Sequence, residues 1–261
     1  MTFEVKNGAF AWPGGRTLFE NVSFTLPGGD TLCVLGANGS GKTTLVKCLM
    51  GLLRWREGAS SADGVDLREL GGAFWKRAAY VPQARPAAFG YTGLEMALLG
   101  RGAHLGLFRQ PGAKDERIAR EALNAVGAGH LADRPLSRVS GGELQLALIA
   151  RALAAEPELM ALDEPESGLD LRNRLMILET VRRLRDERGI SFIINTHQPE
   201  HALTLGGQAL LLPGDGRALV GPAEAILTEA NLSRAFGVDV RIREAEIDGA
   251  RRKGVFVVGE G

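Results

Sequence analysis

One glycine-rich stretch constrains the fold of this chain more than any other feature. Residues 36–44 read GANGSGKTT and match the pattern G-x-x-x-x-G-K-[ST] of a phosphate-binding P-loop. A short, apolar, β-prone run at 31–35 precedes the motif, and a run with helical spacing at 45–51 follows it. This strand-loop-helix context favours a nucleotide site over a chance glycine loop. The candidate nucleotide-binding residues are Gly36, Ala37, Asn38, Gly39, Ser40, Gly41, Lys42, Thr43 and Thr44.

The residue types of this loop suit a nucleotide phosphate. Glycines let the backbone turn its N–H groups toward a phosphate, and the following helix adds its positive N-terminal end. Lys42 can reach the β- and γ-phosphates, and the Thr43 hydroxyl can ligate Mg²⁺. We therefore expect ATP-type chemistry at this loop.

Composition excludes several other classes of protein. The chain has 261 residues, 45% of them hydrophobic, which is enough for a sizeable core. Its 31 basic and 31 acidic residues cancel, so general electrostatic capture of DNA or of an acidic membrane is not expected. Cys33 and Cys48 fit small buried hydrophobes in a reducing compartment. With no signal-peptide pattern and no apolar run of 18 residues, we expect a cytosolic protein.

The first 30 residues predict antiparallel β structure, because apolar positions alternate with polar ones at 21–26 before the turn at 27–29. Trp12 falls in the loop 9–15. It could stack on an adenine ring, or it could simply cover a hairpin, and spacing alone favours the second interpretation.

A second group of candidates begins with Gln83. This residue follows a predicted strand at 78–81 and could ligate Mg²⁺ and orient water, although alone it means little. Glycines and prolines then interrupt the stretch 84–135, with helical patterns at 92–99 and 113–126 between them. We expect a mostly helical insertion within an α/β domain.

Ser140, Gly141, Gly142 and Glu143 precede a strong helical run that ends at Ala155. Ser140 and Glu143 fit a capping box. The stretch is either only a helix start or a second phosphate site, because Ser-Gly-Gly exposes backbone N–H groups at a helix N-terminus.

Two carboxylates, Asp163 and Glu164, follow the apolar strand expected at 159–162. Adjacent charges leaving a buried strand are costly without partners. Beside a P-loop, Asp163 can hold the water shell of Mg²⁺, and Glu164 can polarise an attacking water. Another strand at 190–194 leads to His197, which is either structural or a contact to the γ-phosphate. Short strands at 208–212, 217–220 and 238–242, a helix at 222–228 and a tail strand at 251–258 complete the prediction.

In this order, the motifs resemble those of the ATP-binding subunit of ABC transporters, over essentially the whole chain. The resemblance implies an α/β fold: a P-loop NTPase, ABC-type nucleotide-binding domain with an antiparallel β subdomain and a helical subdomain insertion. It implies a single ABC ATPase domain. Residues 1–83 and 141–237 would form the nucleotide-binding core with the β subdomain, 84–140 the helical subdomain, and 238–261 a C-terminal extension.

The resemblance also implies a role for each motif, and it reverses the interpretation of Trp12 and His197 that spacing favours. Residues 36–44 would be the Walker A loop and 159–163 Walker B, with Mg²⁺ held by Thr43, Gln83 and Asp163. The remaining roles are catalytic base for Glu164, Q-loop glutamine for Gln83, switch histidine for His197, adenine-stacking aromatic for Trp12, a signature acting in trans for Ser140, Gly141, Gly142 and Glu143, and D-loop for Ser167, Gly168, Leu169 and Asp170.

Three positions in two motifs depart from the family pattern. Glu143 stands where the family often has Gln, and Leu144 where a basic residue is common. A carboxylate near a γ-phosphate would repel it unless the side chain turns away, and the capping box gives Glu143 a reason to do so. Gly168 stands where Ala is usual, which loosens the D-loop.

A narrower resemblance concerns residues 99–108, with Tyr91 and Thr92 before them, and the tail 221–232. Both are similar to importer ATPases for iron-siderophores, haem, vitamin B12 and related metal chelates. This implies an ATP-hydrolysing, energy-coupling subunit of a bacterial ABC importer that uses ATP and Mg²⁺.

The same resemblance implies the partners and the location. A head-to-tail homodimer would dock on two membrane permease subunits at the cytoplasmic face of the membrane, as a peripheral protein, while a periplasmic or lipoprotein binding protein delivers cargo. No nucleic acid is expected. The alternatives are a soluble ABC ATPase and an exporter ATPase. Neighbouring genes for a permease with many transmembrane helices and for a periplasmic binding protein would favour the importer. Cargo is not readable here, because this subunit never needs to touch it.

Overall fold

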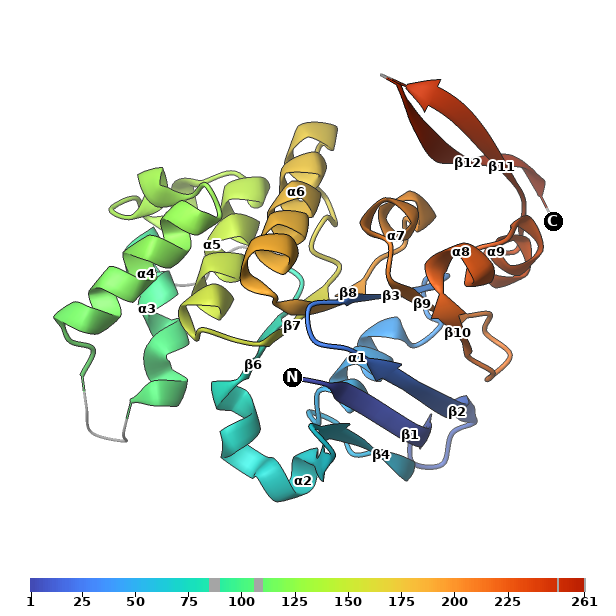
Figure 1. Ribbon diagram of the computed structural model, residues 1–261, viewed down its shortest axis with the longest axis horizontal. Helices are drawn as coiled ribbons and strands as arrows, with labels where there is room; N and C mark the ends of the chain where they lie inside the picture. Colours follow the sequence, from blue (N-terminus) through green and yellow to red (C-terminus); the bar gives the residue numbers. More distant parts are fainter. Residues whose placement is uncertain (85–89, 106–109, 248, 261) are drawn as a thin grey trace. The chain divides into compact units, whose positions relative to one another are not determined.

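Figure 1 presents a computed structural model of the chain, which describes residues 1–84, 90–105, 110–247 and 249–260. Contacts divide the chain into two units, and each is described by itself. The first contains Met1–Arg68 and Ile193–Gly261, and the second contains Glu69–Phe192. Within the described residues, no helix combines the length and apolar character needed to cross a membrane.

An antiparallel sheet forms the N-terminal part of the first unit, with strand order β2-β1-β4-β5. The predicted alternation is confirmed, because Val22, Phe24 and Leu26 are buried while the residues between them are exposed. The Asp63-Gly64 turn, with both φ angles positive, joins the last two strands as a tight hairpin requires. The strands are β1 Phe3–Ala11, β2 Thr17–Leu26, β4 Glu57–Ala62 and β5 Val65–Asp66.

Four more strands of the first unit lie in the order β10-β9-β3-β8. Strand β3 is buried along its whole length and runs parallel to β9, with Leu35 opposite Leu211. A parallel strand that is covered on both faces reads as a continuous apolar run, as residues 31–35 do. The elements are β3 Thr31–Gly36, α1 Lys42–Leu49, the end of β8 Ser191–Asn195, β9 Gln208–Leu212 and β10 Leu219–Pro222.

The C-terminal part of the first unit is a series of short helices followed by a long hairpin (Figure 1, orange to red). The strand predicted at 238–242 extends to Ile247, and the tail strand pairs with it rather than with a larger sheet. Lys253 forms an ion pair with Glu224, which ties the hairpin to the helices. The elements are α7 Pro199–Leu205, α8 Ala223–Ile226, α9 Glu229–Phe236, β11 Val238–Ile247 and β12 Ala250–Glu260.

The second unit begins within α2 and contains a parallel strand pair followed by long helices. Strand β7 lies between β6 and the first residues of β8, and Tyr80 of β6 is opposite Ala161 of β7. The elements outside the helical region are α2 Leu67–Leu70, the 3₁₀ helix η1 Gly71–Lys76, β6 Ala78–Val81, β7 Leu159–Asp163 and α6 Leu171–Arg188.

Helices α3, α4 and α5 pack against one another in the second unit (Figure 1, green to yellow). The helices predicted at 92–99 and 113–126 match α3 and α4, while the domain boundaries inferred from the sequence stay a prediction. This region contains α3 Gly93–Leu99, η2 Gly100–His104, α4 Ala113–Ala125, η3 Gly129–Leu131, η4 Leu136–Arg138 and α5 Gly141–Ala154.

A buried arginine that the sequence did not single out holds these helices together. Arg101 is 5% exposed, and its guanidinium bonds the Asp115 carboxylate, the Ala154 carbonyl and Glu156. His104 contacts the Ala155 carbonyl at 2.8 Å. Because the last carbonyls of a helix lack partners within it, these side chains cap the C-terminal end of α5.

Candidate functional site

The predicted P-loop joins β3 to α1 in the first unit. Helix α1 begins at Lys42, and its N-cap residue Gly41 has φ 97°, a left-handed conformation that glycine adopts without steric cost. The loop therefore leads directly into the first turn of α1. The backbone N–H groups of that turn lack partners within the helix.

Two polar side chains of the loop, those of Lys42 and Ser40, suit an anionic ligand. Lys42 is 5% exposed, and its ammonium donates to the carbonyls of Gly36 and Ala37 at 3.0 and 3.1 Å. The Ser40 hydroxyl is buried without a hydrogen-bond partner among the described residues. Leaving a buried hydroxyl unpaired costs about 1–3 kcal/mol, and an anionic oxygen in the loop would remove that cost.

A cavity of about 210 Å³ opens over the P-loop within the first unit. Residues 37–40 form one side of it. The others come from outside the motif and were missed at the sequence level: Arg16, Thr17, Leu18, Pro213, Gly214 and Ala235. Arg16 comes directly after the loop that carries Trp12. Its closeness in sequence to Trp12 is the one sequence feature that could have indicated it.

Trp12 itself does not line this cavity. Its side chain is 51% exposed, and the ring meets Phe10 edge-on at a centroid distance of 5.1 Å. An exposed indole fits either a stacking surface or a partial cover for the sheet. Its role with adenine stays a prediction.

The end of β8 approaches the P-loop inside the first unit. The Thr196 N–H donates to the Val34 carbonyl of β3, and the Asn195 amide lies 3.4 Å from the Thr43 hydroxyl. His197 comes directly after this point, outside the strand. The structure thus brings the segment that carries His197 to the same edge of the sheet as the loop, as parallel strands require.

In the second unit, a tyrosine holds the carboxylate at the end of β7. Asp163 is 4% exposed, and the Tyr80 hydroxyl donates to its Oδ2 at 2.8 Å. Burial, and then the Asp163 charge, raise the pKa of Tyr80, so its hydroxyl stays a donor. Tyr80 was missed because only the register of β6 against β7 reveals this contact.

Three predicted residues meet beyond β7. The Gln83 amide lies 3.0 Å from the Ser167 hydroxyl and 3.5 Å from the Glu164 carboxylate. Glu164 has φ 47°, a conformation that costs a non-glycine residue about 1–2 kcal/mol. Such strain is common where a side chain is aimed for function.

The segment 167–170 packs against the start of α5 in the second unit. Asp170 caps α6 by accepting from the Asn173 N–H at 2.8 Å. A Cβ atom at Gly142 would come within 2.5–2.8 Å of the Asn173 side chain, so only glycine permits this approach. The predicted capping box is confirmed, since Ser140 and Glu143 bond each other's backbone N–H.

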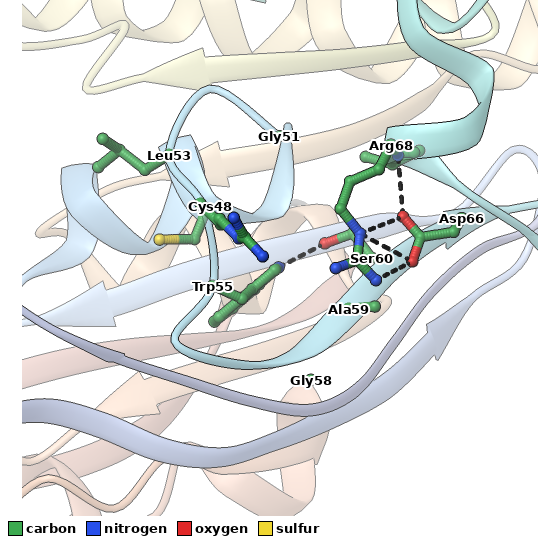
Figure 2. A pocket seen from close by; sticks show the side chains of 11 residues that line it. Cys48, Gly51, Leu53, Trp55, Gly58, Ala59, Ser60, Asp66 and Arg68 are labelled. Atoms are coloured by element: carbon green, nitrogen blue, oxygen red, sulfur yellow. Dashed lines mark hydrogen bonds and ion pairs between the residues drawn. The ribbon is translucent and has the colours of Figure 1, made fainter.

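A larger cavity of about 390 Å³ lies at the C-terminal end of α1 (Figure 2). Two pairs of its polar side chains bond each other: the Trp55 indole N–H donates to the Ser60 hydroxyl, and the Arg68 guanidinium donates to the Asp66 carboxylate. Burial raises the pKa of the Cys48 thiol at its edge to about 12. None of the predicted site residues lines this cavity, so we assign the nucleotide to the P-loop.

Comparison with known proteins agrees with these motifs. The family model described as "ABC transporter" matches residues 19–167, more than half of the chain. An uncharacterized ABC transporter ATP-binding protein of Haemophilus influenzae is 37% identical over 237 residues, covering 90% of this chain and 89% of the relative. The molybdate import ATP-binding protein MolC of the same organism is 34% identical over 242 residues, covering 93% and 90%.

A solved structure gives the same result. A metal-chelate type ABC transporter in an inward-facing conformation matches with a TM-score of 0.89 and 31% identity, covering 98% of this chain and 97% of that one. The predicted α/β P-loop fold and the resemblance to ABC ATP-binding subunits are confirmed. The chain belongs to the ABC transporter family, and it is an ATPase of the kind that forms that family's ATP-binding subunits.

Proposed function

We propose that this chain is the energy-coupling ATPase of a bacterial importer whose cargo is an iron or other metal chelate. The observation that carries the ATPase part is the P-loop, where a lysine is buried, a serine hydroxyl has no hydrogen-bond partner among the described residues, and residues 37–40 line a cavity. Support for the cargo class comes from relatives such as the iron(3+)-hydroxamate import ATP-binding protein FhuC of Bacillus subtilis, 32% identical over 230 residues.

ATP binds, in this proposal, with its phosphates in the loop 36–44. Lys42 exchanges its two carbonyl partners for phosphate oxygens, and the Ser40 hydroxyl gains the partner that it lacks among the described residues. Trp12, exposed beside the sheet, covers the adenine.

The donor set fits Mg²⁺, which prefers oxygen ligands and keeps part of its water shell. The Thr43 hydroxyl, the Gln83 amide oxygen and the Asp163 carboxylate would be the residues that hold the ion, and Tyr80 donates a hydrogen bond to Asp163. When bound, the ion offsets the negative charge of the phosphates. Glu164 accepts a proton from the attacking water, and His197 contacts the γ-phosphate.

Two copies of the chain pair head to tail. ATP on one P-loop leaves γ-phosphate oxygens exposed, and the α5 N-terminus of the second copy, at Ser140–Gly142, supplies N–H groups and a positive dipole end. Two permease subunits dock on the region 84–107, of which residues 85–89, 106 and 107 lie outside the described residues. The protein then sits at the inner face of the membrane, and a binding protein delivers cargo from the other side.

Two substitutions test the ATPase part. Lys42→Ala should abolish detectable Mg-ATP hydrolysis by the purified chain, because the loop loses its only cation. Glu164→Gln should bind Mg-ATP, barely hydrolyse it, and accumulate as a dimer with ATP but not with ADP. Both variants should unfold at the temperature of the native chain to within a few degrees. Native-like hydrolysis by Lys42→Ala would remove the P-loop from the mechanism.

A reconstitution tests the importer part. The chain is combined in proteoliposomes with candidate permease and binding-protein subunits from the same genome, and ATP-driven uptake of ferric siderophores, haem and cobalamin is measured. Uptake of at least one chelate, lost with Lys42→Ala, is the expected result. ATP-driven movement in the opposite direction would favour an exporter.

A further inference from the structure

The acidic residue of the α5 cap has a set of partners that the capping box does not require. One carboxylate oxygen of Glu143 accepts from the Ser140 N–H at 2.9 Å and from the Ser140 hydroxyl at 3.0 Å. The other oxygen contacts His130 Nε2 at 3.1 Å and Arg134 Nη1 at 3.3 Å. All four residues belong to the second unit.

These contacts settle the charge state of the carboxylate. The Ser140 backbone N–H, followed by the His130 contact, holds the pKa of Glu143 below its usual range. Glu143 is therefore a full negative charge at neutral pH, in the first turn of the helix. A negative charge suits a helix N-terminus by itself, but it opposes an incoming phosphate.

The two basic partners come from a segment whose backbone is fixed. The Arg134 N–H donates to the Leu131 carbonyl at the end of η3, and the Arg134 carbonyl accepts from the Gly93 N–H at the start of α3. His130 lies within η3 itself. Their position beside Glu143 is thus set by the fold of the helical region.

We propose that Arg134, through its charge, and His130, through its side-chain contact, are positioning residues that offset and hold the Glu143 carboxylate and so make the α5 N-terminus able to receive the γ-phosphate of ATP bound to a second copy. The inference rests on the proposed function, in which Ser140–Gly142 meets that phosphate. Without the basic pair, the carboxylate presents uncompensated charge.

The argument predicts a specific dependence on Glu143. If His130 and Arg134 act through the Glu143 carboxylate, their loss matters only while that carboxylate is present. If either contacted the nucleotide directly, its loss would be felt whatever stands at position 143. A double-mutant cycle separates the two cases.

The experiment measures steady-state Mg-ATP hydrolysis by the purified full chain. Arg134→Gln should raise KM for ATP about threefold to fivefold, the size expected for a partly exposed charge pair, with kcat within about twofold. His130→Ala should act in the same direction, and Arg134→Lys should restore a native KM. In a Glu143→Gln background, neither Arg134→Gln nor His130→Ala should move KM by more than about twofold.

Arg117→Gln is the matched control. It removes the same charge from α4, where Arg117 pairs with Glu121, and it should leave KM unchanged. Thermal unfolding of every variant identifies a loss that comes from misfolding, and the Glu143→Gln double variants stay informative in that case. An unchanged KM for Arg134→Gln, or a loss of equal size in the Glu143→Gln background, would overturn the inference. Hydrolysis by Lys42→Ala would instead overturn the proposed function.

Discussion

At the scale of single residues, hydrogen-bond partners explain how the chain can bury a charged carboxylate. Asp163 follows an apolar strand and is 4% exposed, a position where a carboxylate needs strong hydrogen bonds. Tyr80 supplies one at 2.8 Å. Hydrogen bonds to charged groups contribute about 1.5–3 kcal/mol when buried.

The first prediction removes that bond. Tyr80→Phe keeps the ring and deletes the hydroxyl, so the free energy of unfolding in urea should fall by about 1–3 kcal/mol. If Asp163 holds the water shell of Mg²⁺, the Mg²⁺ concentration for half-maximal hydrolysis should also rise. Tyr91→Phe, the same change at a half-exposed position, is the control. Equal effects of the two substitutions would contradict this role of Tyr80.

The sequence singles out candidate site residues, but it does not indicate which other side chains hold them in place. The P-loop, Gln83, Asp163 and Ser140 stand out because each follows an apolar strand or starts a helix. Tyr80, His130 and Arg134 do not stand out, because their contacts depend on strand register and on loop backbone far along the chain. No local pattern records such a contact.

At the scale of elements, buried strands are predicted from the sequence more accurately than exposed ones. Strands β6 and β7 were predicted within a residue, because each is a short apolar run that ends at proline or at carboxylates. The C-terminal hairpin was not predicted as a hairpin. Its strands leave Ile247, Phe256, Val257 and Val258 exposed, so alternation gives little information about register.

An ion pair at the start of β6 and β7 gives a pH prediction. Arg77 donates two hydrogen bonds of 2.6 and 2.8 Å to Glu158. These bonds are the largest cause of the low pKa of Glu158, which is about 2 instead of 4.5. A carboxylate whose pKa falls on folding stabilises the protein above pH 4.5 and loses that effect as pH falls toward 2. Because both side chains are about 40% exposed, solvent screening limits the effect.

Arg77→Gln tests this pair. The variant should lose about 1 kcal/mol of unfolding free energy at pH 7, and its difference from the native chain should shrink as pH falls below 4.5. Urea unfolding at a series of pH values between 7 and 3 measures the difference. Arg68→Gln, at the exposed pair with Asp66, gives the comparison for a change of equal charge. A difference that grows on acidification would contradict the assignment.

At the scale of the whole molecule, the chain carries one P-loop and one Ser140-Gly141-Gly142 helix start, each suited to a phosphate. If both served one nucleotide within one chain, a monomer would hydrolyse ATP. If each site is built from the P-loop of one copy and the helix start of the other, it is a composite site. Two inactivating substitutions (lesions) placed on different chains then fall either into the same composite site or into different ones. The distribution of lesions therefore reports the architecture at protein concentrations where the two chains associate.

The last prediction uses this property. A Lys42→Ala chain and a Ser140→Phe chain should each be inactive alone, because in either homodimer both sites carry one lesion. In a mixed dimer one site carries both lesions and the other carries none. If pairing is random and the sites act independently, an equal mixture should recover about one quarter of the native activity.

The recovery should appear only after mixing, and it should rise with protein concentration, since it requires association of the two chains. Two copies of the same variant, mixed as a control, should stay inactive. A monomer that works alone gives the opposite outcome, because neither chain then contains an intact site and mixing restores nothing. Full hydrolysis by a native chain that light scattering finds monomeric during turnover would likewise contradict a site built from two copies.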